Sequence, residues 1–524
     1  MKKMRRIWAL LLALVLTLLL TGCQEQGQGL TLRISLPQEL TTLDPAMVTT
    51  ETEKTVVSHL YENLMKLTSD GEGGTTLVNG LASSYQCEDN LDGTQTYTFH
   101  LRDGLTWADG KPLKASDFVY AWQRLVHPAT ESPNAYLLDM VAGYEEARET
   151  GDMTRLQITA TDDWTLVVVL SHSCLQFPHM VGAAAATMPV RQDMAQKEGW
   201  SMNPNTLVTN GAYRKVTGWE NGVLTVSSTE EYYDYQRLTV ETLQFSCGVA
   251  DEAADFVLTH EGVVEEEGWN LGSLPRTGTL VMNQMASLSE ELRQAMSLTI
   301  DRQQISDLLG SVYVPADGLI PSGIKSTLGG AFRALNGALI DNDPKQYEAR
   351  CQTAKELLQG KTLPPAGNVS LIFVSDSATD QVAEALQKTW REQLGLAVTL
   401  QAVEYEELVT VLHRGEFTMA LVMLECTRND AADMLQDWTG AAEGNYAHIH
   451  NNAYDLLMRI SEVSSSAEAR DAYLSDAERL LLESSHVVPI CFATDSWRLQ
   501  ERLEGVYGDG MGRYFFHYVK EKAK

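Results

Sequence analysis

The feature that most constrains the fold is a regular alternation of apolar runs and helical repeats between residues 369 and 424. The first helical repeat places Val382, Leu386 and Trp390 on one face and ends at Gly395, a residue type that favours a helix C-terminus. The last run is apolar almost throughout, as in strands buried on both faces of a parallel sheet. The pattern predicts a β-α-β-α-β unit and an α/β fold. Its elements are a strand at 369–374, a helix ending before Gly395, a strand from Leu396, a helix from about Glu404 to His413 and a strand from Phe417 to Leu424.

The segment after the last strand, Glu425 to Asp433, has a predictable location. Open α/β sheets place their ligand crevices beyond the carboxyl ends of strands. We therefore expect this segment to lie near a ligand.

The N-terminal half also mixes strands and helices. Leu30 to Leu36 alternate apolar and polar residues, which predicts a half-buried strand, and Val56, Leu60 and Leu64 recur at helical spacing. Further along we expect strands through 97–101 and 164–170, and a helix with Ser116 at its N-cap and Phe118, Trp122 and Leu125 on its apolar face.

Residues 1–23 have the pattern of a lipoprotein signal peptide. Four basic residues precede an apolar run from Ile7 to Leu20, and two small residues lead directly to Cys23. This run is short for a membrane span, which needs roughly 20 residues. We expect cleavage before Cys23 and lipid attachment to it, with the polar stretch to residue 29 as a flexible tether. An uncleaved anchor helix is the alternative, and either arrangement places the body outside the cytoplasm.

The charge of the chain excludes some partners. Without the four basic residues of the signal, 36 Lys and Arg stand against 70 Asp and Glu, a formal charge of −34. Nucleic acid and anionic lipid are therefore not expected to bind. Carboxylates are too frequent for any pair to mark a site, and we interpret Glu51 with Glu53, and the run Glu265 to Glu267, as solvated acidic faces.

Sequence motifs give little evidence for catalysis or metal binding. The HExxH, GxSxG and Walker patterns are absent, so we expect no enzyme activity, no metal and no cofactor. His448 and His450 alternate on an extended segment, which is more typical of surface histidines than of metal ligands. Gly508, Gly510 and Gly512 are interpreted as a loop, because no helical repeat follows them.

Six cysteines remain once Cys23 is set aside, and none of them forms a CxxC pair. Their spacing leaves fifteen full disulfide pairings open, and buried free thiols are the favoured state for most of them. They are Cys87, Cys174, Cys247, Cys351, Cys426 and Cys491.

The block YTFHLRDGLTWADGKP at 97–112 is the most specific of several segments that fit one known family. The others include LDPA at 43–46, LYENL at 60–64, ASDF at 115–118, WQR at 122–124, NGAY at 210–213, LRQA at 292–295 and IDR at 300–302. Taken together, nearly end to end, they resemble the extracytoplasmic solute-binding proteins of oligopeptide and dipeptide ABC transporters, known as family 5.

This resemblance implies a two-lobed, hinge-bending fold of the type II periplasmic-binding-protein kind with an additional inserted domain. The implied division is a signal peptide at 1–22, a lipid-anchored tether at 23–29, lobe I from 30–66, 186–284 and 488–524, an inserted domain II at 67–185, and lobe III at 285–487.

The resemblance also implies a function. The lobes are expected to close on an extended peptide, bound largely through backbone hydrogen bonds, and to present it to ABC permease subunits. We expect a monomer, anchored through Cys23 on the extracytoplasmic face of a cell membrane of Gram-positive type. The alternative keeps this fold and transport role but has a non-peptide ligand, such as a metal chelate or another small solute.

One position departs from the family pattern. Peptide-binding members have an Asp after the Phe417 to Leu424 strand that pairs with the ligand's α-amino group, and here Thr427 occupies that position. A neutral side chain cannot supply this charge, so Glu425 or Asp430 is expected to replace it, unless the segment is an ordinary exposed loop.

Two further residues complete the predicted ligand site. Arg428 could favour a carboxylate or phosphate on the ligand in place of an amine, although an exposed arginine is the alternative. By resemblance, Tyr136 in the inserted domain lends an aromatic ring to the cleft.

Overall fold

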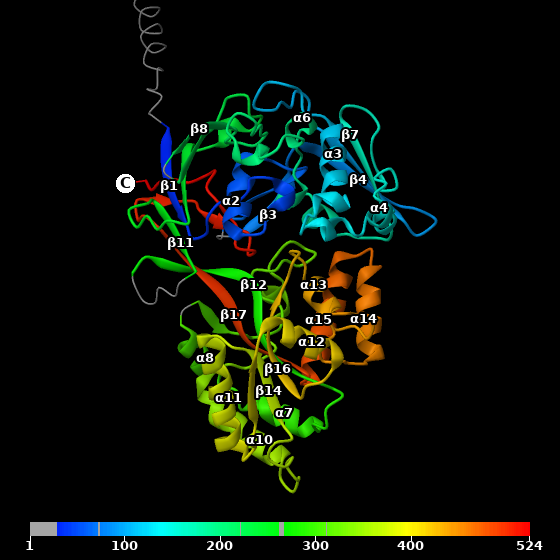
Figure 1. Ribbon diagram of the computed structural model, residues 1–524, viewed down its shortest axis with the longest axis vertical. Coiled ribbons are helices and arrows are strands. Elements are labelled where there is room, and N and C mark those ends of the chain that lie inside the picture. The colour runs from blue at the N-terminus through cyan, green and yellow to red at the C-terminus, as the bar shows by residue number, and fades with distance from the viewer. Residues whose placement is uncertain (1–28, 72–73, 221, 261–266, 311, 524) are drawn as a thin grey trace, which may run out of the picture.

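The computed structural model describes residues 29–71, 74–220, 222–260, 267–310 and 312–523. The predicted signal peptide, Cys23, the tether to residue 28 and the acidic residues Glu265 and Glu266 lie outside the described residues. Figure 1 shows two lobes joined along one side. The upper lobe holds the first half of the chain together with its C-terminal end, and the lower lobe holds most of the second half.

One sheet runs through both lobes, and in the described part of the chain it has 11 strands. Its two longest strands, β12 (Trp269–Met282) and β17 (Val487–Leu499), pair antiparallel and pass together from the upper lobe into the lower (Figure 1). Their register shifts between Ser273 and Thr277, where the lobes meet. The other strands are β15 (Thr399–Val403), β14 (Ser370–Val374) and β16 (Met419–Glu425) on one side of this pair, and β11 (Phe256–Thr259), β1 (Leu30–Leu36), β10 (Val240–Cys247), β9 (Val223–Ser227) and β8 (Lys215–Glu220) on the other, with β13 (Tyr313–Pro315) beside β17.

Buried apolar side chains form three clusters among the described residues, and these follow the division into lobes. One cluster fills the upper lobe and includes Phe245 and Phe516. The other two belong to the lower lobe, where Val281 of β12 belongs to one and Leu280 and Met282 to the other. Because successive strand residues point to opposite faces, the lower sheet has a core on each side.

The predicted β-α-β-α-β unit is confirmed. Strand β14 pairs in parallel with both β15 and β16, and the helices between them are α11 (Ser377–Leu394) and α12 (Tyr405–Arg414). Gly395 and Gly415 follow these helices with φ of 70° and 66°, the left-handed conformation that glycine adopts at helix ends. Strand β16 pairs antiparallel with β12, so the sheet as a whole is mixed.

Several predicted boundaries are wrong by a few residues. Strand β15 begins at Thr399 instead of Leu396, and α2 (Glu51–Leu60) ends before Leu64. Helix α3 (Ala115–Val126) has Lys114 at its N-cap, so Ser116 lies inside the helix. The cause is Asp117, whose carboxylate accepts a hydrogen bond from the Lys114 backbone N–H and so starts the helix earlier.

The right-hand part of the upper lobe contains a separate sheet, in the order β4-β5-β7-β6, against which α3 packs (Figure 1). Phe118, Trp122 and Leu125 of α3 are fully buried, as their spacing predicts. The elements here are β2 (Met65–Ser69), β3 (Thr75–Asn79), β4 (Ala82–Asp89), β5 (Gln95–Leu101), β6 (Ile158–Ala160), β7 (Thr165–Leu170), α4 (Tyr144–Thr150) and α5 (Phe177–Met180).

The lower lobe is covered by helices on both sides of its sheet (Figure 1). These are α7 (Glu290–Leu298), α8 (Arg302–Leu309), α9 (Phe332–Asn336), α10 (Tyr347–Leu357), α11, α12, α13 (Ala431–Gln436), α14 (Asn452–Glu462) and α15 (Ala467–Glu483).

The interpretation of Glu51 and Glu53 as solvated residues is wrong. Glu51 is only 4% exposed and Glu53 is fully buried. The Glu53 carboxylate accepts hydrogen bonds from the backbone N–H groups of Thr41, Thr49 and Thr50, which stabilise its charge. The Thr50 donor belongs to a capping box, Thr50 with Glu53 three residues later, which is a local sequence pattern, whereas the Thr41 donor is supplied by the tertiary fold.

Other predictions about side chains can be compared directly with the structure. Cys247, Cys351, Cys426 and Cys491 are buried free thiols, as favoured for most of the cysteines. Gly510 and Gly512 lie in the turn between the short strands β19 (Tyr507–Gly508) and β20 (Tyr514–Phe515), as predicted for a loop, whereas Gly508 is the last residue of β19. Across the described residues, no three His, Cys, Asp or Glu side chains are grouped so that they could hold a metal ion. Nor does the described part of the chain contain a helix with the length and apolarity of a membrane span.

Candidate functional site

A cavity lies between the two lobes, and both contribute to its lining. It measures about 860 Å³ when the part open to solvent is included. The upper lobe contributes residues of α2, the β2–β3 hairpin, the segment around Tyr136 and the turn after β19, while the lower lobe contributes Lys325, Gly329 and the loop from Thr427 to Asn429. The segment from Glu425 to Asp433 was expected to lie near a ligand, and three of its residues line the cavity.

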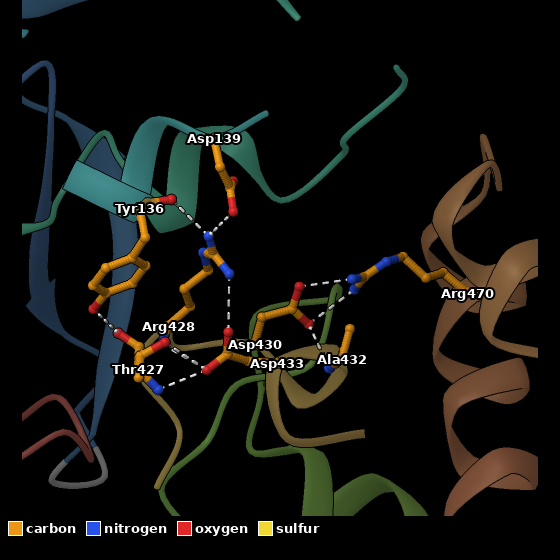
Figure 2. A network of polar contacts seen from close by, with 8 residues as sticks. All are labelled: Tyr136, Asp139, Thr427, Arg428, Asp430, Ala432, Asp433 and Arg470. Carbon is orange, nitrogen blue, oxygen red and sulfur yellow. Dashed lines mark hydrogen bonds and ion pairs between the residues drawn. The ribbon is translucent and has the colours of Figure 1, made fainter. Parts of the chain in front are cut away.

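The loop between β16 and α13 is held by one carboxylate, that of Asp433 (Figure 2). It accepts hydrogen bonds from the Thr427 backbone N–H at 2.6 Å, from the Thr427 hydroxyl at 3.0 Å and from the Arg428 backbone N–H at 3.0 Å. The Arg428 guanidinium adds an ion pair at 3.2 Å. The Asp433 carboxylate therefore already accepts hydrogen bonds from Thr427 and Arg428.

Arg428 also connects the lobes. Its Nη2 donates to the Tyr136 backbone carbonyl at 2.7 Å and to Asp139 Oδ2 at 2.6 Å, and its guanidinium lies over the Tyr136 ring (Figure 2). The Tyr136 hydroxyl in turn donates to the Thr427 carbonyl at 3.4 Å. The predicted site residues Tyr136, Thr427 and Arg428 are therefore in mutual contact and line the cavity.

Burial and charge compete at this contact. The Arg428 side chain is 9% exposed, and although burial disfavours its charge, Asp139 and Asp433 together raise its pKa above the ordinary value. Burial also raises the pKa of the Asp433 carboxyl, against the opposing effect of Arg428 and the backbone donors. Since two carboxylates surround one guanidinium, we take Arg428 to be charged, although its buried Nε has no hydrogen-bond partner among the described residues.

Asp430 points away from the cavity, toward Arg470 of α15 (Figure 2). Its side chain caps α13, and its two oxygens accept hydrogen bonds from Arg470 at 3.1 and 2.6 Å. The residue is 4% exposed and borders a second, larger hollow between α13 to α15 and upper-lobe residues between Asp139 and Met180, about 1940 Å³ measured in the same way. A ligand role for Asp430 stays a prediction.

Glu425, the last residue of β16, lines neither hollow. Its carboxylate pairs with Arg276 of β12 at 3.4 Å, and the same guanidinium pairs with Glu51 of α2 at 2.6 Å. Although burial opposes it, Arg276 helps hold the pKa of Glu51 below the ordinary value. Glu425 thus belongs to a chain of charges across the lobes, and its predicted ligand role also remains untested.

The residues around the cavity include some that sequence reasoning did not select. The turn at Asp509 to Arg513 lines it, with the Asp509 carboxylate bound to Arg513 Nε at 2.6 Å. Gly510 has φ of 78° and packs against Gly323 of the lower lobe so closely that a Cβ would lie 2.3 Å from the Gly323 carbonyl oxygen. The alternating glycines were the available signal for this turn, but nothing local marks Lys54 and Lys325, which also line the cavity.

The fold and cavity define a two-lobed solute-binding protein, in which a ligand would lie between lobes joined by two strands. The family model for bacterial extracellular solute-binding proteins, family 5 Middle, matches residues 76–446. The chain belongs to this family, and the resemblance drawn from its sequence motifs is confirmed.

Individual relatives cover nearly the whole chain. The oligopeptide-binding protein OppA of Bacillus subtilis is 27% identical over 98% of this chain and 99% of its own. The probable deoxycholate-binding periplasmic protein YgiS of Escherichia coli is 29% identical over 86% of each chain. Among solved structures, the unliganded open form of the murein tripeptide binding protein MppA superimposes with a TM-score of 0.81 at 24% identity, covering 94% of this chain and 98% of that one. The two-lobed fold is therefore shown.

Proposed function

We propose that the protein is the lipid-anchored substrate-binding component of an ABC importer, which captures peptides between its lobes and delivers them to a membrane permease. The observation that carries this proposal is the interlobe cavity, lined from both sides. Relatives with peptide-binding names across the full length, such as OppA of Bacillus subtilis, support the ligand class.

The mechanism follows from the strands that join the lobes. A ligand that touches both linings at once binds the closed arrangement more tightly and shifts the population toward it. Bending at β12 and β17, near their register shift, would bring the lobes together. In this arrangement Tyr136, Thr427 and Arg428 would contact the ligand, and the closed form would be the one that a permease recognises.

The ligand class is tested by native mass spectrometry of protein purified without unfolding. We expect added masses that correspond to a mixture of peptides, because backbone recognition tolerates varied side chains. Protein unfolded in urea, dialysed and refolded is the matched control and should lack these masses. A single non-peptide mass in every preparation would refute peptide capture.

The anchor is tested separately. Cleavage before Cys23 and attachment of a diacylglyceryl group would hold the protein, as a monomer, on the extracytoplasmic face of the membrane, since two chains suffice for stable anchoring. We expect Cys23→Ser to release the protein into the medium and to abolish labelling by radioactive palmitate. Retention of both membrane association and label would exclude Cys23 as the anchor.

A second candidate keeps the transport role and changes the ligand to a non-peptide solute. It is favoured by Thr427, which is neutral at the position where the resemblance implies an acid in peptide-binding members, and by Asp433, whose carboxylate is occupied by Thr427 and Arg428. The relative named as a probable deoxycholate-binding protein supports it as well. The mass spectrum above distinguishes the two candidates.

A further inference from the structure

Two hollows lie between the lobes, and two side chains line both of them. The interlobe cavity and the larger hollow beside α13 to α15 share Arg428 and Met180 among the described residues. Arg428 belongs to the loop between β16 and α13 of the lower lobe, and Met180 is the last residue of α5 in the upper lobe. We call these two side chains the shared wall.

Arg428 is fixed in the shared wall from both lobes. Its guanidinium donates to the Tyr136 carbonyl at 2.7 Å and to Asp139 at 2.6 Å in the upper lobe (Figure 2). In the lower lobe it pairs with Asp433 at 3.2 Å. Moving it aside would leave the buried Asp433 carboxylate without its cation, so the side chain is expected to stay in place when a ligand binds.

The partners of Arg428 lie on different sides of the shared wall. Tyr136 lines the interlobe cavity but not the larger hollow, whereas Asp139 and Asp433 line the larger hollow but not the cavity. The guanidinium therefore reaches from one space to the other and separates them.

Met180 is held by the short helix on which it lies. Its backbone N–H donates to the Gln176 carbonyl at 2.9 Å. Phe177 of the same helix is fully buried, with ring centroids 5.0 Å from Tyr97 and 6.2 Å from Trp122. Because a methionine side chain is unbranched and adapts to irregular gaps, it is suited to close the remaining width of the wall.

The two hollows differ in charge. Among the described residues, the larger hollow is lined by six carboxylates against three arginines and one histidine. The interlobe cavity is lined by one carboxylate, that of Asp509, against four lysine and arginine side chains. A lysine or arginine of a ligand is therefore more stable in the larger hollow than in the cavity.

We propose that Arg428 and Met180 close one end of the ligand cavity and so limit the length of the peptide that fits. The acidic hollow beyond them is an extension of the site from which the shared wall excludes the ligand. Shortening either side chain would join the two spaces, and the added residues of a longer peptide would enter the acidic one. The inference rests on the proposed binding of a peptide between the lobes.

The test uses two series of peptides that grow from alanine tripeptide to an octapeptide by one serine at a time. One series grows at the amino end and the other at the carboxyl end. Titration calorimetry measures Kd with protein unfolded in urea and refolded, which removes co-purified ligands. For the wild type we expect a length limit in one of the series, beyond which one further residue raises Kd at least tenfold.

Variants assign this limit to the shared wall. Met180→Ala widens the wall without removing an ion pair, and Arg428→Ala removes the guanidinium itself. We expect each variant to accept a peptide longer by at least one residue, and lysine at the added position to bind about fivefold more tightly than serine. Met285→Ala is the matched control, because this methionine is 70% exposed and lines neither hollow, and it should keep the wild-type limit. Circular dichroism shows which variants are folded.

The proposal is overturned if the wild type has no length limit in either series, or if Met180→Ala and folded Arg428→Ala both keep the wild-type limit. It is also overturned if lysine binds no better than serine beyond that limit, since the added residue would then not enter the acidic hollow. Failure of the peptide function has a different appearance. In that case no peptide of any length binds to the wild type or to a variant, and the length limit falls together with peptide capture.

Discussion

Asp495 is a buried carboxyl on the strands that join the lobes, and its replacement by Asn should stabilise the protein at neutral pH. It lies on β17 opposite Gly272 of β12 and is fully buried. The Tyr514 hydroxyl donates to Oδ1 at 2.5 Å, whereas Oδ2 has no hydrogen-bond partner among the described residues. Burial raises the pKa of Asp495 from 3.8 to about 7, with Glu51 adding to the effect and the Tyr514 hydrogen bond opposing it.

The size and sign of the effect follow from this shift. A rise from 3.8 to about 7 in the folded state corresponds to about 4 kcal/mol. Because the folded protein holds the proton more firmly than the unfolded chain, the contribution is fully present below about pH 4 and is lost as the pH rises to about 7. Asn keeps the shape of the side chain and cannot ionise, so Asp495→Asn avoids the loss.

Thermal unfolding of the wild type and Asp495→Asn at five pH values from 4 to 8 tests this reasoning. We expect equal melting temperatures near pH 4 and an advantage for the variant at pH 8 on the order of 10 °C, from about 2–4 °C per kcal/mol for a unit of lobe size. Asp307→Asn, at an exposed position of α8, is the control and should show no such dependence on pH. A difference between wild type and Asp495→Asn that stays constant from pH 4 to 8 would refute the argument.

Three further substitutions test other parts of the structure. Arg470→Met leaves the buried Asp430 carboxylate without its ion pair and should destabilise the lower lobe by about 3–5 kcal/mol, measured by thermal unfolding. Adding Asp430→Asn to the same chain should recover part of this stability, and no recovery would contradict an ion pair between the two residues. Gly510→Ala should lower the melting temperature more than Gly360→Ala, because both have positive φ but only Gly510 faces a carbonyl, so equal effects would argue against the close approach to Gly323. Glu425→Gln should change the affinity for a bound peptide less than twofold in calorimetry, because Glu425 pairs with Arg276 outside the cavity, and a tenfold loss would contradict that placement.

The parts of the fold that could be predicted from sequence are those set by local periodicity. The unit from β14 to β16 could be predicted because each strand and helix carries its own apolar pattern and each of the two helices ends at a glycine. The antiparallel partner of β16 was not visible, since β12 lies far away in sequence and its pairing depends on tertiary contacts. Helix ends were missed for a similar reason, because a single acceptor such as Asp117 decides them.

The candidate site shows the same limit. Chain topology placed the segment from Glu425 to Asp433 beside the cavity, and motif matching placed Tyr136 there. Topology does not determine which carboxylates face a ligand, because an acid that forms an ion pair with an arginine elsewhere in the fold turns away from the ligand. Asp430 meets Arg470, Glu425 meets Arg276, and Asp433 binds the loop itself. Glu51 was misjudged because its partner Arg276 lies on a strand of the other half of the chain.

The position of β17 near the C-terminus has a consequence for how the chain acquires its structure. In the upper lobe β17 pairs with β11 and with the first residues of β12, and in the lower lobe it pairs with the rest of β12 and with β13. A chain made from its N-terminus onward therefore cannot complete the sheet of either lobe until residues 487–499 have emerged. Until then the unpaired edges of β11 and β12 are exposed to neighbouring chains, a condition that favours aggregation. Loss of residues 487–499 would leave the sheet incomplete in both lobes.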